Sequence, residues 1–134
     1  MTNQTRFLSR LIGLYELIAA LSMGTRRPAA VETVTALVHD RPLLFLVGVI
    51  TLAAGLALVL VHNVWSGGAL AVVVTLIGWI TLIKGLLFLF LPPAAAVDFF
   101  LGQLHYEQLF YLYAAISLIL GVYLAYGGFR STSR

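Results

Sequence analysis

The fold follows from one stretch of sequence, LLFLVGVITLAAGLALVLV at residues 43–61. Its 19 consecutive residues include no charged side chain. A helix of about 20 apolar residues is long enough to cross the hydrocarbon core of a bilayer. No alternation of apolar and polar residues, which would indicate a strand, runs through it. The stretch therefore predicts a transmembrane helix.

Three further stretches have the same character: residues 7–24, which contain Glu16, residues 69–91, which contain Lys84, and residues 109–127. Backbone groups in lipid have no water to bond, so only helices satisfy them in segments of this kind. We predict an all-α membrane fold, a single transmembrane domain over residues 1–134 that forms a compact bundle of four transmembrane helices.

The composition excludes several classes of protein. Of the 134 residues, 61% are hydrophobic and 10% are charged, and the mean hydropathy is +1.02. A soluble domain of this length could not bury so much apolar surface. The eight Lys and Arg residues are scattered along the chain, which argues against a nucleic-acid partner. The lipid bilayer is the expected partner, and the lack of cysteine excludes disulfides and thiolate metal sites.

The two halves of the chain, residues 7–62 and 69–128, resemble each other, which predicts an internal duplication. A shift of 65 residues places Pro28-Ala29-Ala30 on Pro93-Ala94-Ala95, and a shift of 66 places His39 on His105. Each half should form a hairpin of two spans, so both halves should enter the membrane in the same sense, as parallel repeats. The segment between the two spans of each half should form a short amphipathic helix at the membrane interface.

Each span also has two small residues seven positions apart, which places both on one helix face. The pairs are Gly13 and Ala20, Gly48 and Gly55, Gly78 and Gly85, and Ala114 and Gly121. Small residues allow close backbone approach, which holds helices together in lipid, so we expect these faces to be helix contacts.

Glu16 and Lys84 are the most informative side chains, because an ionisable group inside a span is costly and usually has a partner or a purpose. The duplication aligns Glu16 with Thr81 and Lys84 with Ala19, so both charges should lie at a similar depth. We expect an ion pair between them. Its role is either to fix helix packing or to line a path for an ion, a proton or a polar ligand. Alternatively, Lys84 extends to the nearer membrane surface, and Glu16 is neutral or faces a neighbouring subunit.

The short segment between the second and third spans holds a second set of candidates: His62, Asn63 and Trp65. Turn geometry and interfacial anchoring explain these residue types. The functional alternative is contact with a lipid headgroup or a partner. His39 and His105 are a third set, expected at the interface, where an imidazole can respond to pH.

No cofactor, metal site or catalytic activity is expected. The chain has no nucleophile elbow, zinc-protease, phosphate-loop or dinucleotide-binding motif. The three histidines lie at span ends or in connecting segments, and no metal-ligand spacing joins them.

Three motifs carry a resemblance: Gly48-x6-Gly55, His62-Asn63-x-Trp65 and Gly78-Trp79-x4-Lys84-Gly85. Together they resemble a group of small bacterial four-span integral membrane proteins, which has no assigned activity. The paired spans are also similar to those of the HdeD-type acid-resistance membrane proteins, although this chain has fewer spans. The resemblance implies a bacterial inner-membrane location.

The arginines indicate how the chain is oriented in the membrane. Four lie on the side of the two termini: Arg6, Arg10, Arg130 and Arg134. Three lie on the other side: Arg26, Arg27 and Arg41. Positive charge favours the cytoplasmic side, so we expect cytoplasmic termini.

The expected function is non-enzymatic and based on contacts with lipid, with further copies of the chain or with a larger membrane complex. The alternative is a small oligomeric channel or transporter with Glu16 and Lys84 along its path.

Overall fold

The structure, a computed structural model, describes residues 2–130, in which all regular secondary structure is helical. The segments in order are α1 (Asn3–Thr25), α2 (Arg27–His39), α3 (Arg41–Val61), α4 (Ala69–Phe90), α5 (Pro93–Val97), the π-helix η1 (Asp98–Gln103) and α6 (Phe110–Arg130). Four of them, α1, α3, α4 and α6, are long and apolar enough to cross a membrane. The predicted all-α fold with four candidate spans is confirmed. Arg134, used above to assign orientation, lies outside the described residues.

Local sequence accounts for where the helices begin. Thr2 precedes α1, and its hydroxyl accepts a hydrogen bond from the Thr5 amide (3.1 Å). Asp40 precedes α3, and its carboxylate accepts from the Leu43 amide (3.0 Å). Each bond satisfies an amide that has no partner within the first helical turn. Proline lies in the first turn of α2, α3 and α5, where its missing N–H is not needed.

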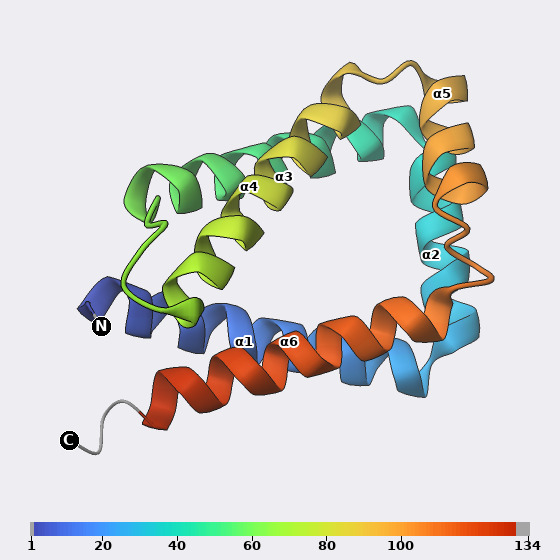
Figure 1. The fold of residues 1–134 in the computed structure, drawn as a ribbon. Coiled ribbons are helices and arrows are strands. Elements are labelled where there is room, and N and C mark those ends of the chain that lie inside the picture. Colours follow the sequence, from blue (N-terminus) through green and yellow to red (C-terminus); the bar gives the residue numbers. More distant parts are fainter. Residues whose placement is uncertain (1, 131–134) are drawn as a thin grey trace.

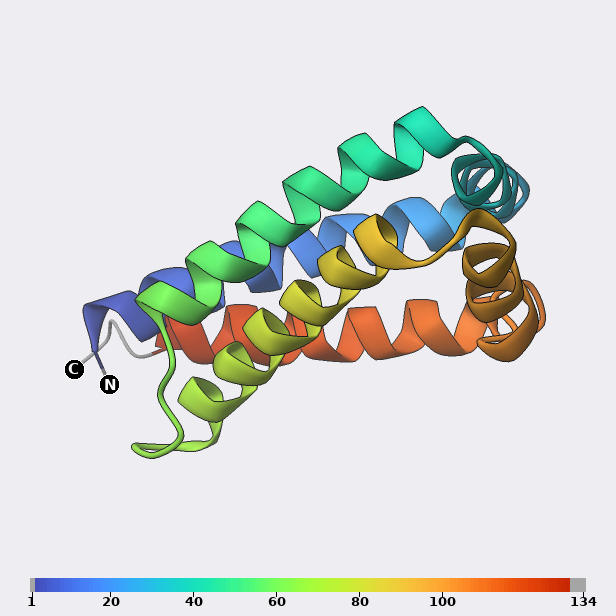
Figure 2. The same cartoon turned by 90° about the horizontal axis from the view of Figure 1, so that it is seen from above.

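The four long helices form two antiparallel pairs. Helix α1 packs along α6, and α3 packs along α4 (Figures 1 and 2). Each half of the chain thus supplies one helix to each pair, and the two spans of one half do not pack on each other as a hairpin. Between the pairs, the main contact is that of α1 with α4.

The expected small-residue contacts are present within each pair. All eight small residues of the predicted faces are buried. A Cβ atom at Gly55 would lie 2.4 Å from the backbone nitrogen of Leu82, and one at Gly13 would lie 2.4 Å from that of Ala125. Distances this short would force the backbones apart. Glycine therefore allows the two helices of each pair to touch backbone to backbone.

The two pairs meet at one end and separate toward the other (Figure 1). We call the meeting end the apex; its buried polar side chains are Thr5, Ser9, His62 and Thr75. An apolar core of Leu8, Ile12, Val74 and Leu124 lies beside them.

At the opposite end, α2 and α5–η1 lie side by side and crosswise to the long helices (Figures 1 and 2). We call this the spacer end. A 13-residue helix such as α2 is about 20 Å long, and it holds the end of α1 that distance from the start of α3. The expectation of one compact bundle is therefore wrong, because the connecting helices separate the two pairs.

The second connecting segment differs from the first, although the duplication predicts two similar helices. Helix α5 is 5 residues long and continues as the six-residue π-helix η1. A second apolar core, formed by Val38, Leu44, Phe88 and Ala96, joins α2 and α5 to α3 and α4. Where η1 ends, His105 has a φ of 47°, a left-handed conformation that breaks the helix before α6.

Candidate functional site

The fold creates a cavity of about 760 Å³ between α1 of one pair and α3 and α4 of the other. This volume lies within the range of small-molecule sites. Its floor toward the apex consists of Leu8, Ile12, Leu58 and Ile77, which belong to the apical core. The polar residues that line it are Gln4, Tyr15, Glu16, Thr51, Thr81 and Lys84.

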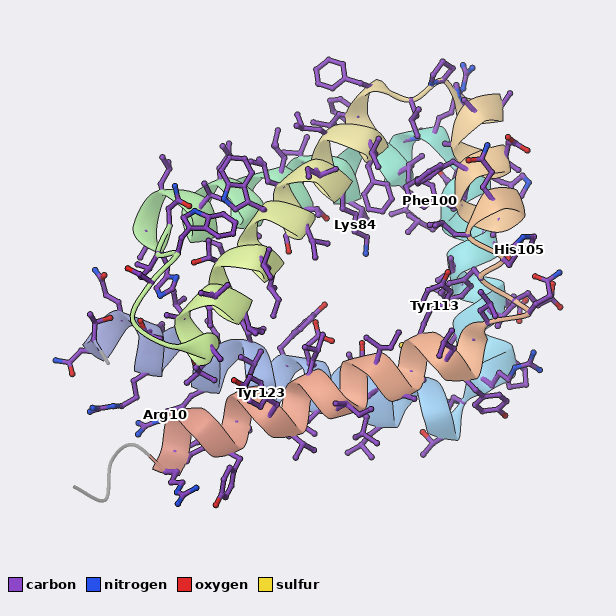
Figure 3. All side chains as sticks on the ribbon, in the orientation of Figure 1. Arg10, Lys84, Phe100, His105, Tyr113 and Tyr123 are labelled. Carbon is purple, nitrogen blue, oxygen red and sulfur yellow. The ribbon has the colours of Figure 1, made fainter. Side chains whose placement is uncertain are left out.

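Both intramembrane charges singled out in the sequence line this cavity. Glu16 is half-buried on α1, and Lys84 is exposed within the isolated chain on α4. Figure 3 shows Lys84 extending from α4 into the space between the pairs. Its Nζ lies 5.6 Å from the ring centroid of Phe88, a cation–π contact.

The expected ion pair between Glu16 and Lys84 is not formed among residues 2–130, because the separation of the helix pairs leaves the cavity between them. Within the same range, Glu16 has no hydrogen-bond or ion-pair partner. The structure therefore brings the two charges to one cavity without joining them.

His62 lies at the apex, not in the cavity, and is 2% exposed. Its Nε2 is 2.9 Å from the Thr5 hydroxyl of α1, and its Nδ1 is 3.1 Å from the Thr75 hydroxyl of α4. The imidazole thus connects three helices, since His62 itself directly follows α3. Neither threonine stood out in the sequence, because each lies far from His62 along the chain.

The Thr75 hydroxyl serves several partners at once. It lies within donating distance of the carbonyl oxygens of Val64 (2.8 Å) and Ala71 (3.0 Å), and it accepts from the Val64 amide (3.0 Å). The hydroxyls of Thr5 and Thr75 each lie within hydrogen-bond distance of one ring nitrogen of His62. Both nitrogens of the buried imidazole therefore have a partner.

Asn63 binds both tryptophans of the chain. Its Oδ1 accepts from the indole N–H of Trp65 (2.8 Å) and from that of Trp79 (3.3 Å). The sequence predicts a turn anchored by Trp65, and the structure adds Trp79 of α4 to it. All three side chains are exposed at the apex, where they surround the connection between α3 and α4.

His39 and His105 lie at the spacer end and are exposed. His39 Nδ1 donates to the Thr35 carbonyl within α2 (2.7 Å). Figure 3 shows His105 at the outer side of the segment between η1 and α6, away from the cavity. Residues 2–130 contain no cluster of three or more His, Cys, Asp or Glu side chains that could hold a metal ion.

The described residues are all-helical, and four helices that are long and apolar enough to cross a membrane are compatible with an integral membrane protein. Comparison of the chain with protein-family models, with functionally described proteins and with solved structures gives no match.

Proposed function

We propose that the protein is a non-enzymatic integral membrane protein that binds an amphipathic, lipid-like molecule in the cavity between its helix pairs. The observation that carries the proposal is the lining of that cavity. Its apolar walls come from α1, α3 and α4, and Glu16 and Lys84 lie among them. A site with apolar walls and a few polar groups suits a ligand that has an apolar chain and a polar head.

The shape of the cavity favours binding over conduction. A pore must open toward both membrane surfaces. Here Leu8, Ile12, Leu58 and Ile77 line the cavity and pack into an apolar core around Val74, which is 1% exposed, while the lining continues along α1 and α3 to Gln4 and Val61. Binding needs no change in this core, whereas conduction through it would need the core to open.

The alternative is a channel or transporter formed by several copies of the chain. The position of Glu16 and Lys84 in one cavity favours it, since a path for ions needs such groups within the membrane. Ion flux through vesicles that contain the purified protein tests this alternative. Flux that is lost in both Glu16→Gln and Lys84→Gln would replace the binding proposal by a transport function.

The internal duplication is part of the proposal, and matching contacts support it. Gly55 lies against Leu82, and Gly121 lies against Leu17. The shifts of 65 and 66 residues align Gly55 with Gly121 and Leu17 with Leu82. Both helix pairs thus use equivalent residues, as expected if an ancestral two-span unit was copied and the two copies exchanged helices.

We further propose that the protein resides in a bacterial inner membrane with its termini in the cytoplasm, as the arginine distribution and the family resemblance suggest. The apex, which lies on the side of the termini, would then face the cytoplasm. Association with further copies or with a larger membrane complex is compatible with the many exposed apolar side chains.

Two adjacent alanines of α3 provide the test. Ala54 lines the cavity, and Ala53 is exposed but does not line it. We expect native mass spectrometry of the protein, purified in mild detergent, to show a bound lipid-like molecule in the wild type and in Ala53→Trp. The adduct should be lost in Ala54→Trp, because the indole fills the site. An adduct in all three proteins, or in none, would contradict the proposal.

A further inference from the structure

We propose that the polar head of the ligand is zwitterionic, with a cationic group that binds Glu16 and an anionic group that binds Lys84. This inference rests on the proposed function and adds the chemical class of the ligand. Its basis is that one acidic and one basic side chain line the same cavity and are not bonded to each other in residues 2–130.

The energetic argument concerns isolated charges. A carboxylate or an ammonium group inside the membrane is costly and requires an opposite charge or a polar partner. Glu16 has no such partner in the described part of the chain. In the same residues, the ammonium group of Lys84 makes only the cation–π contact with the Phe88 ring. A ligand that carries both charges would satisfy both side chains at once and leave the occupied cavity neutral.

Ligands with a single charge fit less well. An anionic head would bind Lys84 but would bring like charge toward Glu16, and a cationic head would do the reverse. An uncharged head would leave both side chains unpaired. Charge complementarity therefore selects a zwitterion from the amphiphiles that the apolar walls accept.

The position of the two charges along the helices orients the ligand. Glu16 is 13 residues beyond the start of α1 and Lys84 is 15 beyond the start of α4, which places them about 20 and 22 Å from the apical ends of their helices. The cavity between them and the apex has the apolar floor. The head would thus lie toward the spacer end, with the apolar chain directed to the apex.

Neighbouring side chains complete the head site. The Lys84 ammonium lies over Phe88, and the Phe88 ring packs on Phe100 of η1 with centroids 5.0 Å apart. The spacer end therefore positions the lysine. Thr51 and Thr81 add hydroxyl groups to the lining, one from each helix of the pair.

The experiment compares four single-chain amphiphiles with the same acyl or alkyl length: lysophosphatidylethanolamine, lysophosphatidylglycerol, a monoacylglycerol and an alkyltrimethylammonium salt. Binding to the full-length protein in mild detergent is titrated by native mass spectrometry. We expect the zwitterionic lysophosphatidylethanolamine to bind about tenfold more tightly than each of the others, as one additional charged hydrogen bond would provide.

Three variants test the assignment of each charge. Glu16→Gln should shift the preference toward the anionic amphiphile, and Lys84→Gln should shift it toward the cationic one. The exchange of both charges, Glu16→Lys with Lys84→Glu, should retain the preference for the zwitterion. A purely structural role of the two residues would change stability and leave the order of headgroups unchanged.

The outcomes distinguish the two proposals without depending on any variant. Equal binding of all four amphiphiles to the wild-type protein would overturn the zwitterionic assignment and leave the proposed function intact. Tighter binding of the anionic or the cationic amphiphile would also overturn it. If no amphiphile binds, the proposed function itself fails.

Discussion

Gly55 of α3 lies so close to Leu82 of α4 that an added Cβ atom would be 2.4 Å from the Leu82 backbone nitrogen. Leu82 cannot move away by changing a side-chain rotamer, because the contact is with its backbone. The two helices of this pair are therefore held at a distance that only glycine permits.

We accordingly expect Gly55→Ala to lower the free energy of unfolding by about 1–3 kcal/mol, the usual cost of overpacking. Titration with a denaturing detergent, followed by circular dichroism, measures the change. Gly24→Ala is the control, since a Cβ atom there has no neighbour within 4 Å. Gly121→Ala, against Leu17, should destabilise like Gly55→Ala. A tolerated Gly121→Ala would argue against equivalence of the two pairs.

The second prediction concerns the apex. His62→Ala should lower the free energy of unfolding by about 1–3 kcal/mol, because Thr5 and Thr75 would each lose a buried hydrogen-bond partner. Thr75→Val should have a similar effect, since the same hydroxyl also bonds Val64. Detergent-induced unfolding measures both variants.

Thr33→Val is the matched control for Thr75→Val. Thr33 is exposed on α2, and its hydroxyl bonds only the Ala29 carbonyl one turn earlier (2.7 Å). Its replacement should change the stability by less than about 0.5 kcal/mol. Equal effects of the two substitutions would show that the buried network adds nothing to the stability of the apex.

The third prediction uses Tyr106, which lies between η1 and α6, outside the candidate spans. Its ring stacks on Tyr113 and meets Phe110 edge to face, and this burial raises the pKa of its phenol above the ordinary value of 10.0. The folded protein thus holds this proton more tightly than the unfolded chain. The contribution of Tyr106 to the free energy of unfolding should therefore be constant below pH 10. It should be lost as the pH rises from 10 through the raised pKa.

Absorbance at 295 nm, recorded during an alkaline titration, follows phenolate formation. Tyr106→Phe should remove a late step from the titration curve and should lessen the loss of stability above pH 10. If the step that Tyr106→Phe removes lies at or below pH 10, Tyr106 is not buried in the folded protein.

Much of the site is predictable from the amino-acid sequence. Glu16 and Lys84 stood out because charge is rare in apolar spans, and the small-residue faces stood out because their spacing repeats in all four helices. Thr5 and Thr75 did not stand out, and Trp79 belonged to a motif but had no predicted partner. A threonine or a tryptophan in a span is ordinary in itself, and only the meeting of α1, α3 and α4 makes these three residues partners of His62 and Asn63.

The amino-acid sequence alone determined that the chain is all-helical with four apolar spans, because lipid leaves no other way to satisfy the backbone and because apolar length is a local property. The tertiary structure decided which helices pair, and that α2 and α5–η1 separate the pairs and leave a cavity between Glu16 and Lys84. Those features depend on backbone contacts such as Gly55 with Leu82 and on the length and direction of the connecting helices. The periodicity and composition of a single segment predict neither the contacts between helices nor the direction of the connecting helices.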